Sequence, residues 1–237
     1  MFNSIPPITR NIIIINIIVF IAAYFVPQLD YFLSAYYPFS PNFKSWQVIT
    51  HMFMHGNLMH ILFNMMTLFS FGPILEQSLG ERRYLILYFL SGLGAFFLYN
   101  IWNFIEVQQL VSQLQAMNID AKDFLNTLIS NPETALTHNQ AEENLAGIYF
   151  GRMVGASGAI FGVIAAFATL YPEAKIGIMF IPIPMKVKYV LPIVIVISIY
   201  LGASGNGGGI AHFAHVGGAL VGWILARIWR KHLYRFN

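Results

Sequence analysis

Three short stretches of this 237-residue chain combine polar and small residues in patterns that could support covalent catalysis. The first holds His60 and Asn64, which are four residues apart and so share one face of a helix. The second holds Ser157 within the sequence GASGAIFG. The third, AHFAHVGGALVG, holds His212 and His215. A serine, an imidazole and further hydrogen-bond donors are the groups that nucleophilic acyl transfer requires.

The residue types suggest a role for each group. A serine hydroxyl is a good nucleophile only when a neighbouring base accepts its proton, and His215 is the base that we expect for Ser157. His212, three residues earlier, is the rival base. Small residues at spacings of three and four let two helices approach closely. Gly158 and Gly162 have this spacing after Ser157, and Gly218 and Gly222 share one helix face with His215.

Donors to a tetrahedral oxyanion are also expected near the serine. The candidates are Asn64, His60 and the backbone N–H of Ser157. No Asp or Glu occurs in the apolar stretches around His215, so the sequence predicts a Ser–His dyad rather than a triad with a carboxylate.

These residues must be positioned inside a membrane. Hydrophobic residues make up 57% of the chain and charged residues 10%, where soluble domains carry about 25% charged residues. An ordinary cytosolic domain is therefore excluded, and so is a disordered or nucleic-acid-binding tail, because the net charge is only +3 and the basic residues form no stripe. The absence of cysteine excludes disulfides and thiol catalysis. The composition predicts an integral membrane protein.

Charge-free apolar stretches predict six transmembrane helices, because one span needs about 20 mostly apolar residues. We expect an all-α bundle forming a single membrane domain over residues 1–237. The expected helices cover about residues 11–27, 58–72, 84–104, 154–171, 189–203 and 210–227.

Lysine and arginine counts predict the orientation of the bundle. With the N-terminus inside, all but three of the 13 Lys and Arg residues fall on the cytoplasmic side, the exceptions being Lys44, Lys122 and Arg152. Both termini are therefore expected in the cytoplasm. The polar, acidic segment 106–149, between the third and fourth helices, is then an extracytoplasmic insertion, for which we expect one or two short surface helices.

Taken together, the three motifs resemble the rhomboid family of intramembrane serine proteases. The resemblance covers H-x-x-x-N at His60–Asn64, G-x-S-G at Gly155–Gly158 and A-H-x-x-G-x-x-x-G at Ala214–Gly222. Each motif alone is weak, but all three occur in order on the expected helices, so the resemblance spans nearly the whole chain. It implies a six-helix rhomboid-like fold.

The resemblance also implies roles for individual residues. Ser157 would be the nucleophile and His215 its general base, while His60 and Asn64 would form the oxyanion hole with the Ser157 amide. Gly155 would belong to the strained loop that exposes the serine. The substrates would be single-span transmembrane proteins cut near the outer membrane face, without cofactor or metal. The expected location is the plasma (inner) membrane of a bacterium, with the lipid bilayer and no nucleic acid as further partner.

Other positions are compared with the family as well. His51 and His55 match histidines that support the first loop, and Glu76 matches a structural acidic residue. The chain departs from the family at Trp46-Gln47, where an arginine often follows the tryptophan. That departure leaves open how the first loop is held.

Three alternative functions stay open or are weakened by the sequence. A catalytically silent rhomboid-like scaffold that binds transmembrane helices would not need Ser157 and His215 together. A membrane metalloprotease with histidine ligands lacks the H-E-x-x-H signature. A transporter would place polar residues along a path across the whole bilayer, whereas here they gather in the outer half.

Overall fold

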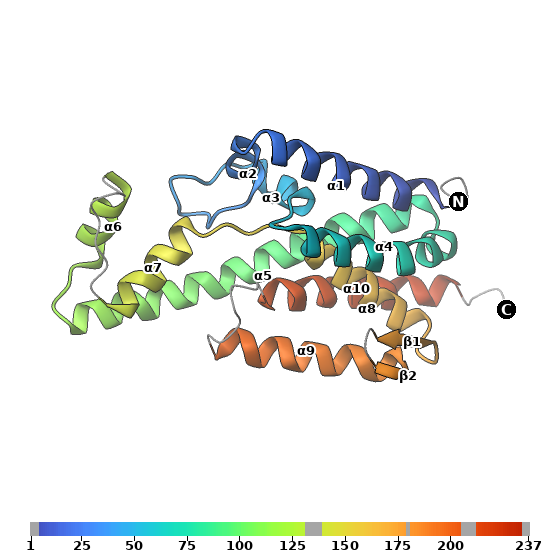
Figure 1. Cartoon of the computed structure of the whole chain (residues 1–237). Helices are drawn as coiled ribbons and strands as arrows, with labels where there is room; N and C mark the ends of the chain where they lie inside the picture. Colours follow the sequence, from blue (N-terminus) through green and yellow to red (C-terminus); the bar gives the residue numbers. More distant parts are fainter. Residues whose placement is uncertain (1–4, 131–138, 179–180, 205–211, 234–237) are drawn as a thin grey trace.

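The computed structural model describes residues 5–130, 139–178, 181–204 and 212–233. Within them the chain is mostly helical, and a bundle of six helices forms its main body (Figure 1). In chain order these are α1 (Pro7–Phe25), α4 (Leu58–Leu79), α5 (Glu81–Ala116), α8 (Ser157–Leu170), α9 (Val187–Ala203) and α10 (His212–Leu233). The start of α1 and the end of α10 lie at the same end of the bundle (Figure 1).

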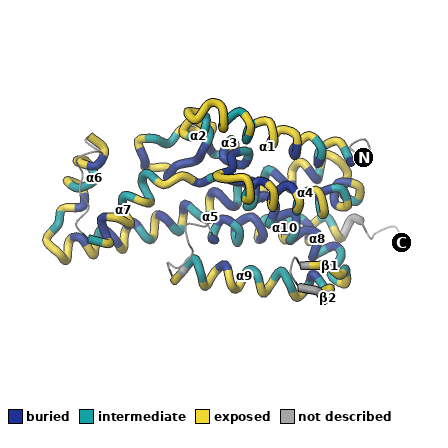
Figure 2. The backbone as a smooth tube through the Cα atoms, in the orientation of Figure 1, coloured by how far each residue is buried: buried dark blue, intermediate teal, exposed yellow. Residues whose placement is uncertain are grey.

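The peripheral helices expose apolar side chains along their length. Among the described residues, α1, α4 and α5 are long and apolar enough to cross a bilayer, and α8 and α9 are shorter apolar helices. Figure 2 shows many exposed positions along α1 and α9. Ile18 of α1 is 59% exposed and Val196 of α9 is 65% exposed. Apolar exposure on this scale is typical of a lipid-facing surface, and the chain is a membrane protein.

Helix α8 lies inside the bundle, packed against α4, α5 and α10. Its sequence is rich in Gly and Ala, which lets neighbouring backbones approach. A Cβ atom added to Gly218 of α10 would overlap the carbonyl of Gly158, and one added to Gly222 would overlap that of Gly162. This close approach brings the first turns of α8 and α10 together. The core around α8 contains fully buried side chains from α4 and α5: Leu68, Leu75, Tyr84, Leu87 and Tyr88.

Helix α1 begins at Pro7, earlier than the start expected near residue 11, and a carboxylate from α4 caps it. Glu76 accepts hydrogen bonds from the backbone N–H of Ile8 at 2.8 Å and of Thr9 at 2.7 Å, and from the Thr9 hydroxyl at 2.7 Å. The first N–H groups of a helix lack intrahelical partners, so a carboxylate there is strongly favourable. Helix α4 continues through Pro73 to Leu79 instead of ending near residue 72, which brings Glu76 to this position.

Helix α5 is longer than a membrane is thick. Its 36 residues span about 54 Å at 1.5 Å per residue, against about 30 Å for the hydrocarbon core. Its far end carries α6 (Ala121–Ser130) and α7 (Gln140–Phe150), which project from the bundle (Figure 1). A separate apolar cluster, which includes Leu110, Leu114 and Leu145, holds them together. The insertion expected at 106–149 therefore begins as a continuation of the third long helix; residues 131–138 within it lie outside the described part.

A long loop connects α1 to α4 and carries the short helices α2 (Gln28–Leu33), α3 (Gln47–Thr50) and η2 (His51–Phe53). Ala35 in this loop pairs with Met153, the two backbones exchanging hydrogen bonds of 3.0 and 2.8 Å. The guanidinium of Arg152 also forms an ion pair with Asp30 of α2. The loop is thereby attached to the segment that precedes α8.

A β-hairpin connects α8 to α9, and the expectation of an all-α chain missed it. Strands β1 (Lys175–Ile178) and β2 (Ile181–Lys186) pair antiparallel, with Lys175 opposite Lys186. Next to the hairpin, Glu173 accepts a 2.7 Å hydrogen bond from Lys186 and forms a further ion pair with Lys188. Strands this short give little periodic signal, so the pairing partner decides the structure.

Candidate active site

The centre of the candidate site is a contact between α8 and α10. The Oγ of Ser157, the first residue of α8, lies 3.0 Å from the Nε2 of His215, which is one turn into α10. The two residues are 58 positions apart in sequence and meet because the two helices pack closely at their glycines. This distance is that of a hydrogen bond, so the imidazole is placed to accept the hydroxyl proton.

A second aromatic ring orients the imidazole. Phe161 follows Ser157 by one helical turn, and its ring stacks on that of His215 with centroids 4.2 Å apart and planes at 3°. The stack opposes rotation of the imidazole about its Cβ–Cγ bond and covers one face of the ring. Sequence reasoning overlooked Phe161; its spacing of four from the serine was the available signal.

His212 does not occupy the position of a base for Ser157. It starts α10 and is buried, and among the described residues neither ring nitrogen has a hydrogen-bond partner. Its ring contacts that of His215 edge-on, with centroids 6.2 Å apart. Of the two histidines, His215 is the one whose nitrogen lies at hydrogen-bond distance from the serine.

The backbone immediately before the serine faces His60 and Asn64. Gly155 has φ +120°, a conformation that residues with a side chain rarely adopt. A Cβ atom there would lie 2.7 Å from His60 Nε2 and 3.7 Å from Asn64 Nδ2. The buried Nδ2 of Asn64 has no hydrogen-bond partner among the described residues. An unsatisfied buried donor beside a potential nucleophile is available to an oxyanion.

The first loop fixes the backbone of the Ser157 segment. The N–H of Gly155 donates to the carbonyl of His51 at 3.0 Å. The Nδ1 of His51 in turn lies 2.8 Å from the carbonyl of Gln47. Together with the Ala35–Met153 pairing, these bonds hold the segment before α8 at two points. Positions 51 and 47 therefore act on the site through the backbone.

Gln47, which stands where the resemblance leads one to expect arginine, is buried and holds the loop by neutral hydrogen bonds. Its Oε1 accepts from the N–H of Lys44 at 2.9 Å. Its Nε2 contacts the carbonyls of Asn42 at 3.4 Å and Phe32 at 3.5 Å. The amide thus joins α3 to two other parts of the loop without introducing a buried charge.

The ring of His55 contacts that of His60 edge-on, with centroids 5.0 Å apart. It is buried, and neither of its ring nitrogens has a partner among the described residues. Three or more His, Cys, Asp or Glu side chains arranged to hold a metal ion are not found in the part of the chain that the structure describes. The histidine-liganded metal centre considered as an alternative thus has no assembled ligand set there.

A comparison with known protein families finds a match to most of the chain. The family described as the Rhomboid domain matches residues 42–108 and 123–232. The matched segments contain the serine, the two histidines and the asparagine of the site. They omit residues 109–122, which form the distal part of α5, the turn that follows it and the first two residues of α6.

Proposed function

Since the chain belongs to the rhomboid family, we propose that it is an intramembrane serine endopeptidase that cleaves transmembrane proteins through a Ser157–His215 dyad. The observation that carries this proposal is the 3.0 Å contact between the Ser157 hydroxyl and the His215 imidazole. The aligned Phe161 ring and the unsatisfied Asn64 amide support it.

In the proposed reaction, the Oγ of Ser157 attacks the scissile carbonyl carbon while His215 Nε2 accepts the hydroxyl proton. The carbonyl oxygen becomes an oxyanion that accepts hydrogen bonds from Asn64, His60 and the Ser157 N–H. The C–N bond then breaks, and His215 donates its proton to the departing amine. Water attacks the resulting ester, again with His215 as base, and releases the second product.

We propose six membrane crossings with both termini in the cytoplasm of a bacterial cell, the chain being a multi-pass protein of the plasma membrane. The asymmetry of Lys and Arg along the sequence supports this orientation. The common location of the start of α1 and the end of α10 agrees with an even number of crossings (Figure 1). The dyad then lies toward the outer face, where a single-span substrate would enter laterally from the lipid.

The experiment that tests this proposal is cleavage of a single-span reporter in liposomes. Wild type is compared with Ser157→Ala and His215→Ala, and with His212→Ala as the matched histidine control. We expect the first two variants to be inactive, the control to retain activity, and a chelator to have no effect. Loss of activity in the control alone would assign the base to His212, and survival of Ser157→Ala would refute the dyad.

A catalytically silent scaffold is an alternative function, and a covalent serine reagent distinguishes it from a selective protease. A fluorophosphonate reacts with an activated serine even when no protein substrate is cut. We expect wild type to be labelled and both Ser157→Ala and His215→Ala to stay unlabelled. A folded wild type that neither cuts the reporter nor reacts with the reagent would establish the scaffold.

A further inference from the structure

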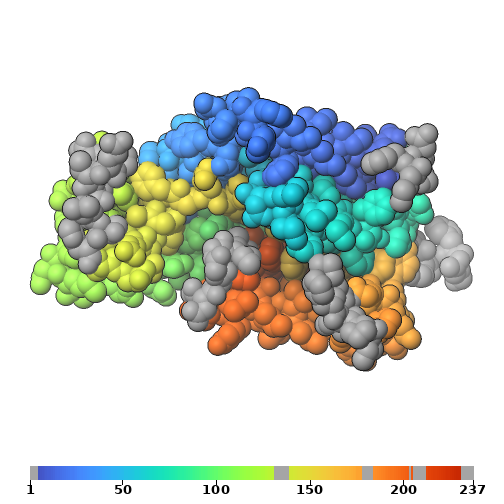
Figure 3. Space-filling view, viewed as in Figure 1, coloured from blue at the N-terminus to red at the C-terminus, as the bar shows by residue number. Residues whose placement is uncertain are grey.

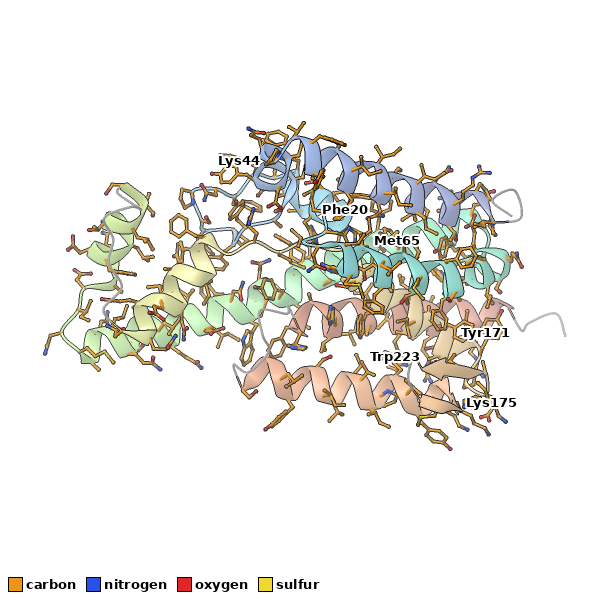
Figure 4. The ribbon with its side chains drawn as sticks, in the orientation of Figure 1. Phe20, Lys44, Met65, Tyr171, Lys175 and Trp223 are labelled. Atoms are coloured by element: carbon orange, nitrogen blue, oxygen red, sulfur yellow. The ribbon has the colours of Figure 1, made fainter. Side chains whose placement is uncertain are left out.

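A groove of about 290 Å³ lies between α1 and α4, away from the candidate dyad. In the space-filling view these two helices lie against each other along the upper part of the molecule (Figure 3). Three side chains on α4 that line it are about half exposed: Leu62 is 45%, Met66 49% and Phe69 45% exposed, whereas Met65 is buried. Figure 4 labels Met65, a further lining residue, on the same helix. The groove therefore opens toward the lipid.

The wall of the groove has one charge. Arg10 and Ser70 are its polar lining residues, and the rest of the lining is apolar. The Ser70 hydroxyl already donates to the Met66 carbonyl at 2.8 Å. Among the described residues, the Arg10 guanidinium has no ion-pair partner. A ligand that satisfies this groove must be apolar over most of its length and anionic at one end.

The dimensions of the groove relate it to one leaflet of a bilayer. Eight residues separate Leu62 from Ser70 on α4, a rise of about 12 Å. One leaflet contributes about 15 Å of hydrocarbon. Arg10 lies in the first turn of α1, at the end of the bundle where Glu76 contacts Thr9. The charge therefore lies near the membrane surface, and the apolar wall runs from it toward the bilayer centre.

We propose that this groove binds an anionic phospholipid, with its phosphate on Arg10 and one acyl chain along Ile13, Met66 and Leu62. Under the orientation proposed above, the lipid comes from the cytoplasmic leaflet, whose anionic lipids basic residues attract. The bound lipid contacts both α1 and α4 near the Glu76 contact and stabilises that helix pair. Lipid binding at this groove does not depend on proteolysis, so it can be confirmed or refuted separately from the proposed reaction.

The test measures lipid binding to the 237-residue chain in neutral detergent micelles. Phosphatidylglycerol and phosphatidylcholine with identical acyl chains are titrated, with native mass spectrometry and the thermal unfolding midpoint as readouts. The variants are Arg10→Gln, Arg10→Lys and Met66→Trp. Arg82→Gln is the matched charge control, because Arg82 is exposed in the first turn of α5. Leu220→Trp on α10, where Leu220 is 49% exposed, is the control for an added tryptophan.

We expect phosphatidylglycerol to raise the unfolding midpoint of wild type and phosphatidylcholine to raise it much less. Arg10→Gln should weaken phosphatidylglycerol binding about tenfold or more, the loss typical of one charge-assisted hydrogen bond. Met66→Trp should block the groove, while Arg10→Lys and both controls keep most of the affinity.

Three results would overturn the proposal. Equal affinities for phosphatidylglycerol and phosphatidylcholine would show that the charge of the lipid headgroup does not contribute to binding. An equal loss in Arg82→Gln would indicate nonspecific attraction to a basic surface. Competition by inorganic phosphate at matched ionic strength would show a site for the free anion rather than for a lipid.

Discussion

Replacing Gly155 by alanine tests the geometry of the site most directly. At φ +120° a residue with a side chain is strained by about 1–3 kcal/mol. The new Cβ atom would lie 2.7 Å from His60 Nε2, whereas ordinary contacts begin near 3.4 Å. His60 or the backbone before Ser157 must therefore move by about 0.7 Å, the difference between these two distances.

A displacement of this size should affect catalysis more than folding. Loss of one oxyanion donor lowers kcat by about 10²–10³, and misplacement of a reacting group by 1 Å can have a similar effect. We expect Gly155→Ala to lower kcat for reporter cleavage about a hundredfold and to slow fluorophosphonate labelling in parallel. The thermal unfolding midpoint should fall by only a few degrees.

Gly56→Ala is the matched control, since it changes a glycine of the loop before α4, next to Val154 of the segment before α8, without the strain. Its Cβ atom would meet Val154 Cγ2 at 3.9 Å, an ordinary contact. We expect near wild-type activity from this variant. If Gly155→Ala cleaved the reporter as fast as Gly56→Ala, the argued strain at Gly155 and the placement of His60 beside the oxyanion would both be wrong.

Three further predictions concern the supports of the site and the fold. Phe161→Ala should lower kcat roughly threefold to tenfold through loss of the ring stack, while Phe161→Tyr should retain the wild-type kcat. If Phe161→Ala cleaved the reporter as fast as wild type, the ring would not orient His215. Glu76→Gln should lower the free energy of unfolding by about 2–4 kcal/mol in chemical denaturation, because one of the two accepting oxygens becomes an NH2 group that cannot accept a hydrogen bond; an unchanged value would refute the cap. Lys186 and Lys188 lower the pKa of Glu173 to about 2, so the contribution of this carboxylate to stability is complete above pH 4.5 and decreases as the pH falls toward 2. The thermal unfolding midpoints of Glu173→Gln and wild type should therefore converge as the pH falls over that range. A difference that stays constant with pH would contradict this.

Membership in the rhomboid family was predictable from the sequence, and the family match confirms it. The charge-free stretches indicated the long helices, because hydropathy and length are local properties of the chain. The motifs around Ser157 and His215 could also be recognised from the sequence, since each lies within a few consecutive residues. The residue types at the site and its membrane environment can therefore be predicted from short segments of the sequence.

Tertiary structure alone decided how those segments meet. The choice of His215 over His212 as the hydrogen-bonded histidine depends on the packing of α10 on α8, between residues 58 positions apart. The Glu76 cap joins positions 67 apart and extends α1 beyond its apolar stretch. The hairpin β1–β2 likewise exists through pairing that neither strand encodes by itself. Sequence determined which groups are present, because residue type and helical period are local, whereas distances between groups depend on the packing of the whole bundle.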